Sequence, residues 1–263
     1  MAALTLSLIQ TTLQWEDPAA NRIAFEAKIA ALSGKTQVVI LPEMFATGFS
    51  MNAEALAENM DGETVTWMKE IAAKHKLILT GSLIIKDGND YYNRLLWVLP
   101  NGQLGTYDKR HLFAYAGEDK HYTPGSKRFI ASVNGWRINL QVCYDLRFPV
   151  WARQQYSEEG FEYDVLVYVA NWPHRRATAW KALLQARAIE NQCYVIGVNR
   201  VGEDGHGNYH SGDSTVVDPL GEVLYAKGDE EDVFTITLDK AHLEAVREKL
   251  PFWKDADRFD LLL

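Results

Sequence analysis

The sequence predicts a single α/β domain with two layered sheets, and three observations support this fold class. Strand-like apolar segments alternate with amphipathic helical patterns in the first part of the chain, and the second half approximately repeats that order. The 263 residues, 47% of them hydrophobic, are enough to build a substantial core. No linker rich in Pro, Gly or Ser separates the two halves, so we expect one domain.

The individual elements follow from the local patterns. Segments rich in β-branched and aromatic residues predict strands at 4–9, 37–41, 77–85, 91–99, 138–142, 165–170, 194–199, 214–217, 223–225 and 233–238. Amphipathic periodicity predicts helices at 18–32, 64–75, 150–157, 178–191 and 240–249, the first of them capped by Asp17. A turn at 87–89 joins two of the strands into a hairpin.

Composition argues against several classes of protein. The 27 basic and 35 acidic residues leave a net charge of −8, with no basic block that could follow a phosphate backbone, so we expect no nucleic-acid partner. The longest apolar runs, 38–41 and 165–170, are far shorter than the roughly 18 residues of a membrane span. The two cysteines are too few for a disulfide framework, and the N-terminus reads as a strand rather than a signal peptide. We therefore expect a cytoplasmic protein with no membrane partner.

The C-terminal tail differs from the rest of the chain. Residues 251–263 contain apolar side chains, including Phe252, Trp253 and Phe259, without helical or strand periodicity. We therefore divide the chain into a domain at 1–250 and a tail at 251–263. The tail is expected to pack on its own domain or on a neighbouring subunit, and the second option is the sharper hypothesis.

Three chemically active side chains follow predicted strands. Glu43 comes directly after the apolar run 38–42, and Cys143 stands between a strand and a turn that leads into a helix, where a nucleophile would be exposed. The backbone N–H of Tyr144 is then placed to stabilise an oxyanion, and Lys109, after the hairpin, could stabilise a thiolate or an oxyanion. Each has an ordinary alternative: a surface carboxylate, a buried inert thiol and a surface lysine. Cys193 lacks such a corner and is expected to be core.

Taken together, three motifs resemble the nitrilase superfamily of carbon–nitrogen hydrolases. They are Leu-Pro-Glu-Met-Phe at 41–45, Asp-Lys-Arg-His-Leu-Phe at 108–113 and Cys-Tyr-Asp-Leu-Arg-Phe-Pro at 143–149. The resemblance implies an α-β-β-α sandwich in which Glu43 is the general base, Lys109 stabilises the intermediate and Cys143 is the nucleophile. Glu118 resembles the family's second glutamate, which orients the lysine; its alternative is a solvated loop residue. The resemblance also implies a homodimer or higher homo-oligomer.

Within that superfamily the loop at 45–51 resembles bacterial omega-amidases, which hydrolyse the terminal amide of 2-oxo acids such as 2-oxoglutaramate. Such chemistry proceeds through a thioester on the cysteine and requires no metal or cofactor. His206 and His210 lie in a glycine-rich segment at 202–212 rather than on a helix, which argues against a zinc pair. No phosphate-binding or dinucleotide-binding loop is present in the sequence.

An omega-amidase must also bind a carboxylate at the end of the substrate remote from the amide, and arginine is the natural partner. Arg147, Arg175 and Arg176 all follow predicted strands and are candidates, although each could pair with surface acids instead. Trp172 could form an apolar wall, and Phe49, Met51, Tyr115 and Tyr122 are weaker candidates for the pocket. Two alternatives stay open: a different amide, nitrile or N-carbamoyl substrate, and a catalytically silent binding protein.

Overall fold

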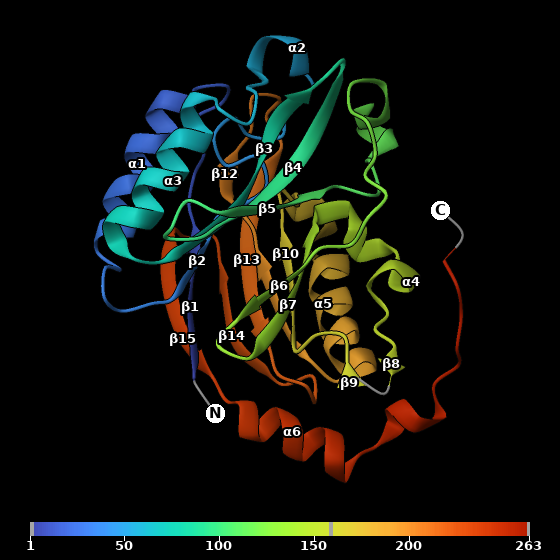
Figure 1. Ribbon diagram of the computed structural model, residues 1–263. Helices are drawn as coiled ribbons and strands as arrows, with labels where there is room; N and C mark the ends of the chain where they lie inside the picture. The colour runs from blue at the N-terminus through green and yellow to red at the C-terminus, as the bar shows by residue number, and fades with distance from the viewer. Residues whose placement is uncertain (1–2, 158–159, 262–263) are drawn as a thin grey trace.

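Two β-sheets packed face to face form the centre of the computed structural model, which describes residues 3–157 and 160–261 (Figure 1). The first sheet has the strand order β15-β1-β2-β3-β4-β5. Its strands are β1 Leu4–Gln10, β2 Val38–Ile40, β3 Ile78–Asp87, β4 Asp90–Val98, β5 Leu104–Asp108 and β15 Asp232–Leu238. β1, β2 and β3 are parallel, whereas β4 returns antiparallel to β3.

The second sheet repeats this arrangement. Its main path is β12-β13-β11-β10-β7-β6, and β14 pairs with β13. Its strands are β6 Ile130–Val133, β7 Trp136–Val142, β10 Val165–Val169, β11 Tyr194–Val198, β12 Val201–Glu203, β13 Tyr209–Val217 and β14 Val223–Gly228. β7, β10 and β11 are parallel, and β13 lies antiparallel to β11. Three parallel strands followed by an antiparallel strand thus occur in each half, as the sequence predicted.

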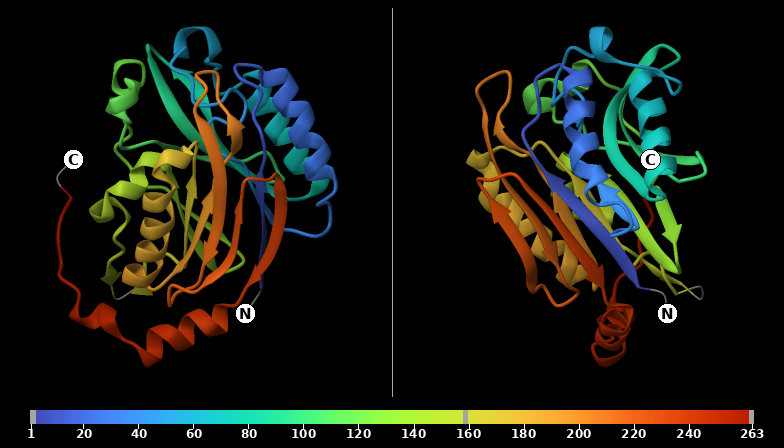
Figure 2. Two further views of the ribbon diagram at one scale, coloured as in Figure 1. Left: turned by 180° about the vertical axis from the view of Figure 1, so that it is seen from behind. Right: turned by 90° about the vertical axis from the view of Figure 1, so that its left-hand side faces the viewer.

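Helices cover the outer face of each sheet, which gives the layer order α-β-β-α (Figure 2). The helices are α1 Pro18–Ala30, α2 Ala53–Leu56, α3 Glu63–His75, α4 Pro149–Ala152, α5 Ala177–Asn191 and α6 Lys240–Lys249. α1 and α3 pack on the first sheet through buried side chains such as Phe25 and Met68, and α5 packs on the second through Trp180 and Leu184. Apolar side chains of both sheets, including Leu6 and Leu140, fill the space between them.

Several elements differ from the sequence prediction. The helix expected at 150–157 is a single turn, α4, after which the chain becomes extended and forms a small hairpin from β8 Tyr156–Ser157 and β9 Gly160–Phe161. There the backbone N–H of Gln154 donates to Asn191 Oδ1, and the carbonyl of Ala152 accepts from the Tyr163 hydroxyl, in place of helical hydrogen bonds. β5 and β6 were not predicted because their outward faces are polar or half exposed. The glycine-rich segment at 202–212 is a β-hairpin between β12 and β13 rather than an open loop.

After α6 the tail runs along the side of the chain's own domain that contains β8 and α4 (Figure 1). A 3₁₀ helix, η5 Phe252–Asp255, places the ring of Trp253 against Tyr156, with 3.8 Å between the ring centroids. Further along, Gln155 Nε2 donates to the carbonyl of Phe259 at 2.8 Å. Phe252 remains 62% exposed. The last two apolar residues of the predicted tail, 262 and 263, lie outside the described residues.

In the part of the chain that the structure describes, no helix has both the length and the apolar character needed to cross a membrane.

Candidate active site

Glu43 lies just beyond the carboxyl end of β2, and its side chain is fully buried. Its Oε1 accepts hydrogen bonds from Lys109 Nζ at 2.9 Å and from Asn93 Nδ2 at 2.8 Å. Its Oε2 accepts from the backbone N–H of Asn171 at 2.8 Å. Because Asn93 belongs to β4 and Asn171 follows β10, the two sheets together hold this carboxylate.

Lys109, directly after β5, stands between two carboxylates. Its Nζ lies 2.8 Å from Glu118 Oε2 as well as 2.9 Å from Glu43 Oε1, and all three side chains are at most 1% exposed. Glu118 Oε2 also accepts from the backbone N–H of Phe113. Burial alone would lower the pKa of Lys109, but the charges of Glu118 and Glu43 outweigh it and raise that pKa above its ordinary value. The lysine is therefore a permanent cation of the site.

Cys143 stands at a sharp corner between β7 and the 3₁₀ helix η3, which covers Cys143–Arg147. Its φ of +46° lies in the left-handed region, which is strained for a residue with a Cβ. The buried carboxylate of Asp145 holds this corner, since it accepts from Val142 N at 3.0 Å and from Tyr107 Oη at 2.7 Å. The fold thus keeps Cys143 in a strained backbone conformation, which Asp145 stabilises through its hydrogen bonds with Val142 and Tyr107.

The thiol of Cys143 lies close enough to Glu43 and Lys109 for the charges of both to act on it. Burial, reinforced by the charge of Glu43, holds the pKa of the thiol well above its ordinary value, although Lys109 opposes the shift. The thiol is therefore uncharged at neutral pH and must lose its proton as it reacts, and the adjacent carboxylate can accept that proton. Cys193 lies fully buried in the core beneath α5, as the sequence predicted.

A small cavity opens at Cys143, with about 80 Å³ accessible to the centres of water-sized molecules. Of the substrate-binding residues predicted from sequence, Phe49, Arg147 and Trp172 line it, together with Glu43, Lys109 and Tyr144. The cavity suits a substrate with few heavy atoms.

Three of the predicted pocket residues lie elsewhere. Met51 packs in a separate apolar cluster with Met44 and Tyr122, because the loop after Glu43 turns this side chain away from the thiol. Tyr122 also belongs to that cluster, and its hydroxyl donates to Ser50 O. Tyr115 is 81% exposed, since the 3₁₀ turn η1 Ala114–Ala116 projects its ring outward, and Ala116 lines the cavity instead.

Three arginines contribute positive charge to the lining of the cavity. Arg147, Arg175 and Arg176 all border the cavity, and among the described residues none of them forms an ion pair. Arg147 lies over the ring of Trp172, and Arg176 over that of Phe113, each at 4.9 Å from the centroid. Burial and the neighbouring Arg175 lower the pKa of Arg176. These guanidinium groups are therefore available to an anion.

Sequence reasoning missed three residues of the site. Asn93 and Asn171 hold Glu43, and His210, on the hairpin strand β13, lines the cavity with its Nδ1 2.9 Å from Asn208 O. A mid-strand asparagine has no local signal, because its importance depends on what the neighbouring strands place beside it. Over residues 3–157 and 160–261, no cluster of three or more His, Cys, Asp or Glu side chains is arranged to hold a metal ion.

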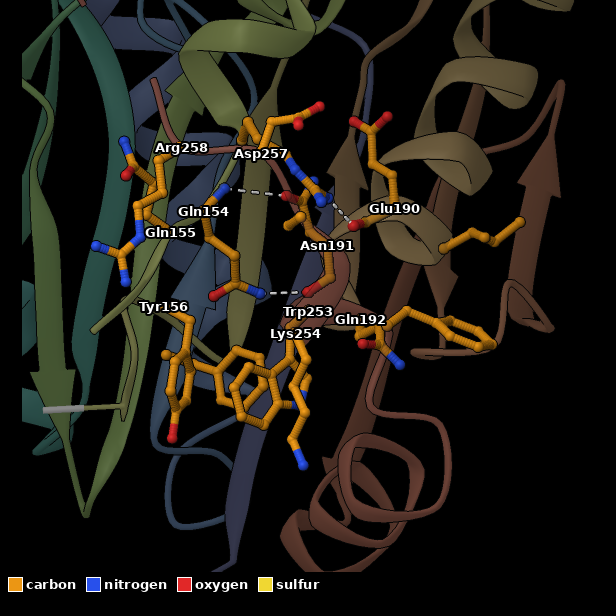
Figure 3. A pocket seen from close by; sticks show the side chains of 15 residues that line it. Gln154, Gln155, Tyr156, Glu190, Asn191, Gln192, Trp253, Lys254, Asp257 and Arg258 are labelled. Carbon is orange, nitrogen blue, oxygen red and sulfur yellow. Dashed lines mark hydrogen bonds between the residues drawn. The ribbon is translucent and has the colours of Figure 1, made fainter. Parts of the chain in front are cut away.

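A larger hollow, of about 490 Å³, lies between the C-terminal end of α5 and the tail (Figure 3). Its polar side chains bond mainly to the protein itself: Gln154, for example, donates from its backbone N–H to Asn191 Oδ1 and from its Nε2 to the Asn191 carbonyl, as the dashed lines mark. It contains no pairing of a thiol with a carboxylate. The smaller cavity at Cys143 is therefore the candidate active site.

Comparison with known protein families decides the class. Residues 5–248 match the model of the carbon–nitrogen hydrolase family. The chain belongs to this family. Carbon–nitrogen hydrolases use water to cleave carbon–nitrogen bonds, so the protein is a hydrolase that acts on amide bonds, which confirms the resemblance seen in its motifs.

Two curated proteins and one solved structure show which carbon–nitrogen hydrolases the chain is similar to. The chain is 44% identical to the omega-amidase YafV of Escherichia coli (strain K12) over 99% of this chain and 100% of that protein. It is 34% identical to the 2-oxoglutaramate amidase of Bacillus subtilis (strain 168), over 95% and 96% of the two chains. The structure of XC1258 from Xanthomonas campestris, a CN-hydrolase superfamily protein with an arsenic adduct in its active site, has a TM-score of 0.96 and 46% identity over 99% of this chain and 100% of that one. These neighbours confirm the α-β-β-α fold.

Proposed function

We propose that the protein is an omega-amidase that hydrolyses the terminal amide of a short 2-oxo dicarboxylic acid monoamide, such as 2-oxoglutaramate, to the acid and ammonia. The observation that carries the proposal is that one small cavity is lined by the half-buried thiol of Cys143, the buried carboxylate of Glu43 and guanidinium groups that form no ion pair among the described residues. The names of two full-length relatives, an omega-amidase and a 2-oxoglutaramate amidase, agree with it.

In the first half of the reaction, Cys143 Sγ attacks the amide carbon and its proton passes to Glu43. The carbonyl oxygen becomes an oxyanion; when it collapses, the carbon–nitrogen bond breaks and Glu43 returns the proton to the leaving nitrogen. Ammonia departs and a thioester to Cys143 remains. The high pKa of the thiol makes this transfer to a fixed base necessary.

In the second half, water replaces the thiol. Glu43 accepts a proton from the water as its oxygen bonds to the thioester carbon, and a second oxyanion forms. The carbon–sulfur bond then breaks and the sulfur recovers the proton, which restores the enzyme. The whole cycle consumes one water for each amide and needs no redox or metal cofactor, because every proton transfer uses Glu43.

The oxyanion of both steps lies next to Lys109 and to the backbone N–H of Tyr144 in this mechanism. Each preorganised donor of this kind is typically worth about 3 kcal/mol of transition-state stabilisation. Glu118 fixes the ammonium of Lys109 with a 2.8 Å contact, which keeps it aimed without a change of charge. We therefore assign Glu43, Lys109, Cys143 and Glu118 as the catalytic set.

The substrate's remote carboxylate is assigned to Arg147 and Arg176. Both guanidinium groups are partly buried, stack on aromatic rings and lack an ion-pair partner among the described residues, whereas Arg175 is exposed and can only attract the anion from a distance. A second function stays open at the same catalytic set, namely hydrolysis of another small amide, a nitrile or an N-carbamoyl compound.

Ammonia release from a substrate panel tests this function. We expect turnover of 2-oxoglutaramate, slower turnover of glutamine and of monoamides without the 2-oxo group, and very slow turnover of amides without a carboxylate. Arg176→Gln should raise KM for the anionic substrates about tenfold and leave the uncharged amides unchanged, since a charged hydrogen bond contributes about 1.5–3 kcal/mol. Turnover of a nitrile or an N-carbamoyl amino acid alone would replace this function with the second one.

Cys143→Ala is the matched control for the chemistry. It should abolish ammonia release while circular dichroism and the melting temperature stay close to those of the wild type. Intact-mass measurement after brief incubation with substrate should detect the acyl adduct in the wild type only. Substantial residual activity in the variant would rule out the thioester mechanism.

Four further proposals concern the whole chain. We propose that the protein is cytoplasmic, which its two free cysteines support. We propose that its partner is a small-molecule amide, with no nucleic acid or membrane.

We also propose that residues 1–250 form the hydrolase domain and residues 251–263 a tail. The fourth proposal is a homodimer to which this tail contributes. The exposed Phe252 in the tail supports this assembly.

A further inference from the structure

We infer that Asn93 is a positioning residue that divides the two oxygens of Glu43 between two tasks. It holds one oxygen in place so that the other is free to exchange protons with Cys143. This inference rests on the proposed role of Glu43 as the base.

The hydrogen bonds around Glu43 are unequally distributed. Oε1 accepts from Lys109 Nζ at 2.9 Å and from Asn93 Nδ2 at 2.8 Å, whereas Oε2 accepts only from Asn171 N, at 2.8 Å, within the described part of the chain. A carboxylate oxygen has two lone pairs, so Oε1 is fully occupied and one lone pair of Oε2 remains. This free lone pair of Oε2 is therefore the one that can accept the proton of the neighbouring Cys143 thiol, which borders the same cavity as Glu43.

Asn93 also links the two carboxylates. The same Nδ2 lies 3.3 Å from Glu118 Oε1, and an amide nitrogen carries two hydrogens, one for each glutamate. Its backbone carbonyl accepts from Lys109 N at 3.0 Å, so one residue of β4 contacts three members of the catalytic set. The side chain is 1% exposed, which excludes bulk water as a replacement donor.

The neutrality of the amide matters as much as its geometry. Two carboxylates and one ammonium already leave a net charge of −1 in a buried site, and burial raises the pKa of Glu118 against the opposing effect of Lys109. A second ammonium at position 93 would stabilise the ionised form of Glu43 and so weaken it as a base. A carboxylate there would repel Glu43 and Glu118. An amide supplies hydrogens without either effect, so it stabilises the ionised carboxylates and leaves their ability to take up a proton intact.

Asn93→Leu removes the donor at nearly constant volume, and Asn139→Leu is the matched control. Asn139 is an equally buried asparagine in the interior of β7, and within the described residues its side-chain amide has no hydrogen bond to the catalytic set. We expect Asn93→Leu to lower kcat by roughly 10- to 100-fold, a cost typical for loss of a residue that orients a functional group, with KM within threefold. The acidic limb of its pH–kcat/KM profile should move to higher pH, since a carboxylate without its donor is protonated more readily.

Asn93→Asp preserves the size of the side chain and serves if the leucine variant fails to fold. At pH 8 its carboxylate repels Glu43 and Glu118, so we expect a greater loss than in Asn93→Leu. As the pH falls, its carboxyl group gains a hydrogen that can replace the amide donor, and activity relative to the wild type should rise. A constant ratio across pH would indicate a packing role and overturn the inference.

Alkylation of Cys143 by iodoacetamide, followed by intact mass, separates this inference from the proposed substrate. The acidic limb of the alkylation rate should move in Asn93→Leu and stay in place in Asn139→Leu, whatever amide the enzyme uses. An unshifted limb in the first variant would overturn the positioning role and leave the proposed function standing. Failure of the substrate panel, with a shifted limb, would overturn only the choice of substrate.

Discussion

At the scale of single residues, the site depends on two strained backbone positions. Cys143 and Met44, which follow strands of different sheets, both have positive φ values, +46° and +43°. Such strain persists only where surrounding contacts over-determine the backbone, and Asp145 and Ser82 supply those contacts by accepting the N–H groups of Val142 and Met44. Residue type and position after a strand left Cys143 open as an inert thiol, and the family motif at 143–149 predicted it as the nucleophile; its backbone strain was not predicted.

His210 provides a pH test at this scale. Burial, with the nearby charge of Arg200, lowers its pKa to about 4, whereas an unfolded histidine titrates near 6.5. Between these values the unfolded chain binds a proton that the folded chain does not, so stability falls as the pH drops through this window. We expect the wild type to lose about 2 kcal/mol more unfolding free energy than His210→Asn between pH 7 and pH 5, measured by urea denaturation. Equal losses would contradict this assignment.

At the scale of elements, the largely buried strands were predicted well from sequence, whereas the half-exposed strands β5 and β6 were not. The alternation in β1 and the long apolar strands β10 and β11 are determined by burial. The helix expected at 150–157 reduces to α4 because the following residues, 153–155, bond to α5 and to residue 162 instead of to one another. Such tertiary competition leaves no trace in periodicity.

The packing of α5 on β11 depends on the absence of a side chain at Gly197. A Cβ there would lie 2.6 Å from Leu184 Cδ1 and 2.6 Å from Trp180 Cζ2. Gly197→Ala should therefore lower the free energy of unfolding by about 1–3 kcal/mol, the usual cost of overpacking, as measured by chemical denaturation. In the double variant with Leu184→Ala the two effects should be less than additive, because the second change removes one of the clashing groups. Strict additivity would show that α5 moves away freely.

At the scale of the whole molecule, the stacking of two similar sheets creates the site. Glu43 and Lys109 follow strands of the first sheet, and Cys143 and Asn171 follow strands of the second, so neither half contains the full set. The net charge of −8 conceals a local cationic wall formed by Arg147 and its neighbours. Such a wall attracts a small anion although the protein as a whole repels it.

The C-terminal tail, residues 251–263, provides a test of the proposed homodimer. A chain that ends at Leu250 loses the contact of Trp253 with Tyr156 and the exposed apolar ring of Phe252. We expect light scattering to find a dimer for the full chain and a lower mass for the shortened chain at the same concentration. Thermal unfolding serves as the control, because the shortened chain should still unfold cooperatively. A monomeric full-length protein would refute the dimer.

The sequence by itself determined the layered α/β class and the family, because these depend on local burial patterns and on short motifs, and the same motifs predicted Glu43, Lys109, Glu118 and Cys143 as the site residues. The tertiary structure alone decided which side chains meet. Asn93 and His210 act only through neighbours distant in sequence, and Met51 and Tyr115 turned away from the cavity they were expected to line. The physical reason is that a hydrogen bond or a cavity wall is a property of pairs, whereas a periodic pattern reports only on which face of its own element a residue lies.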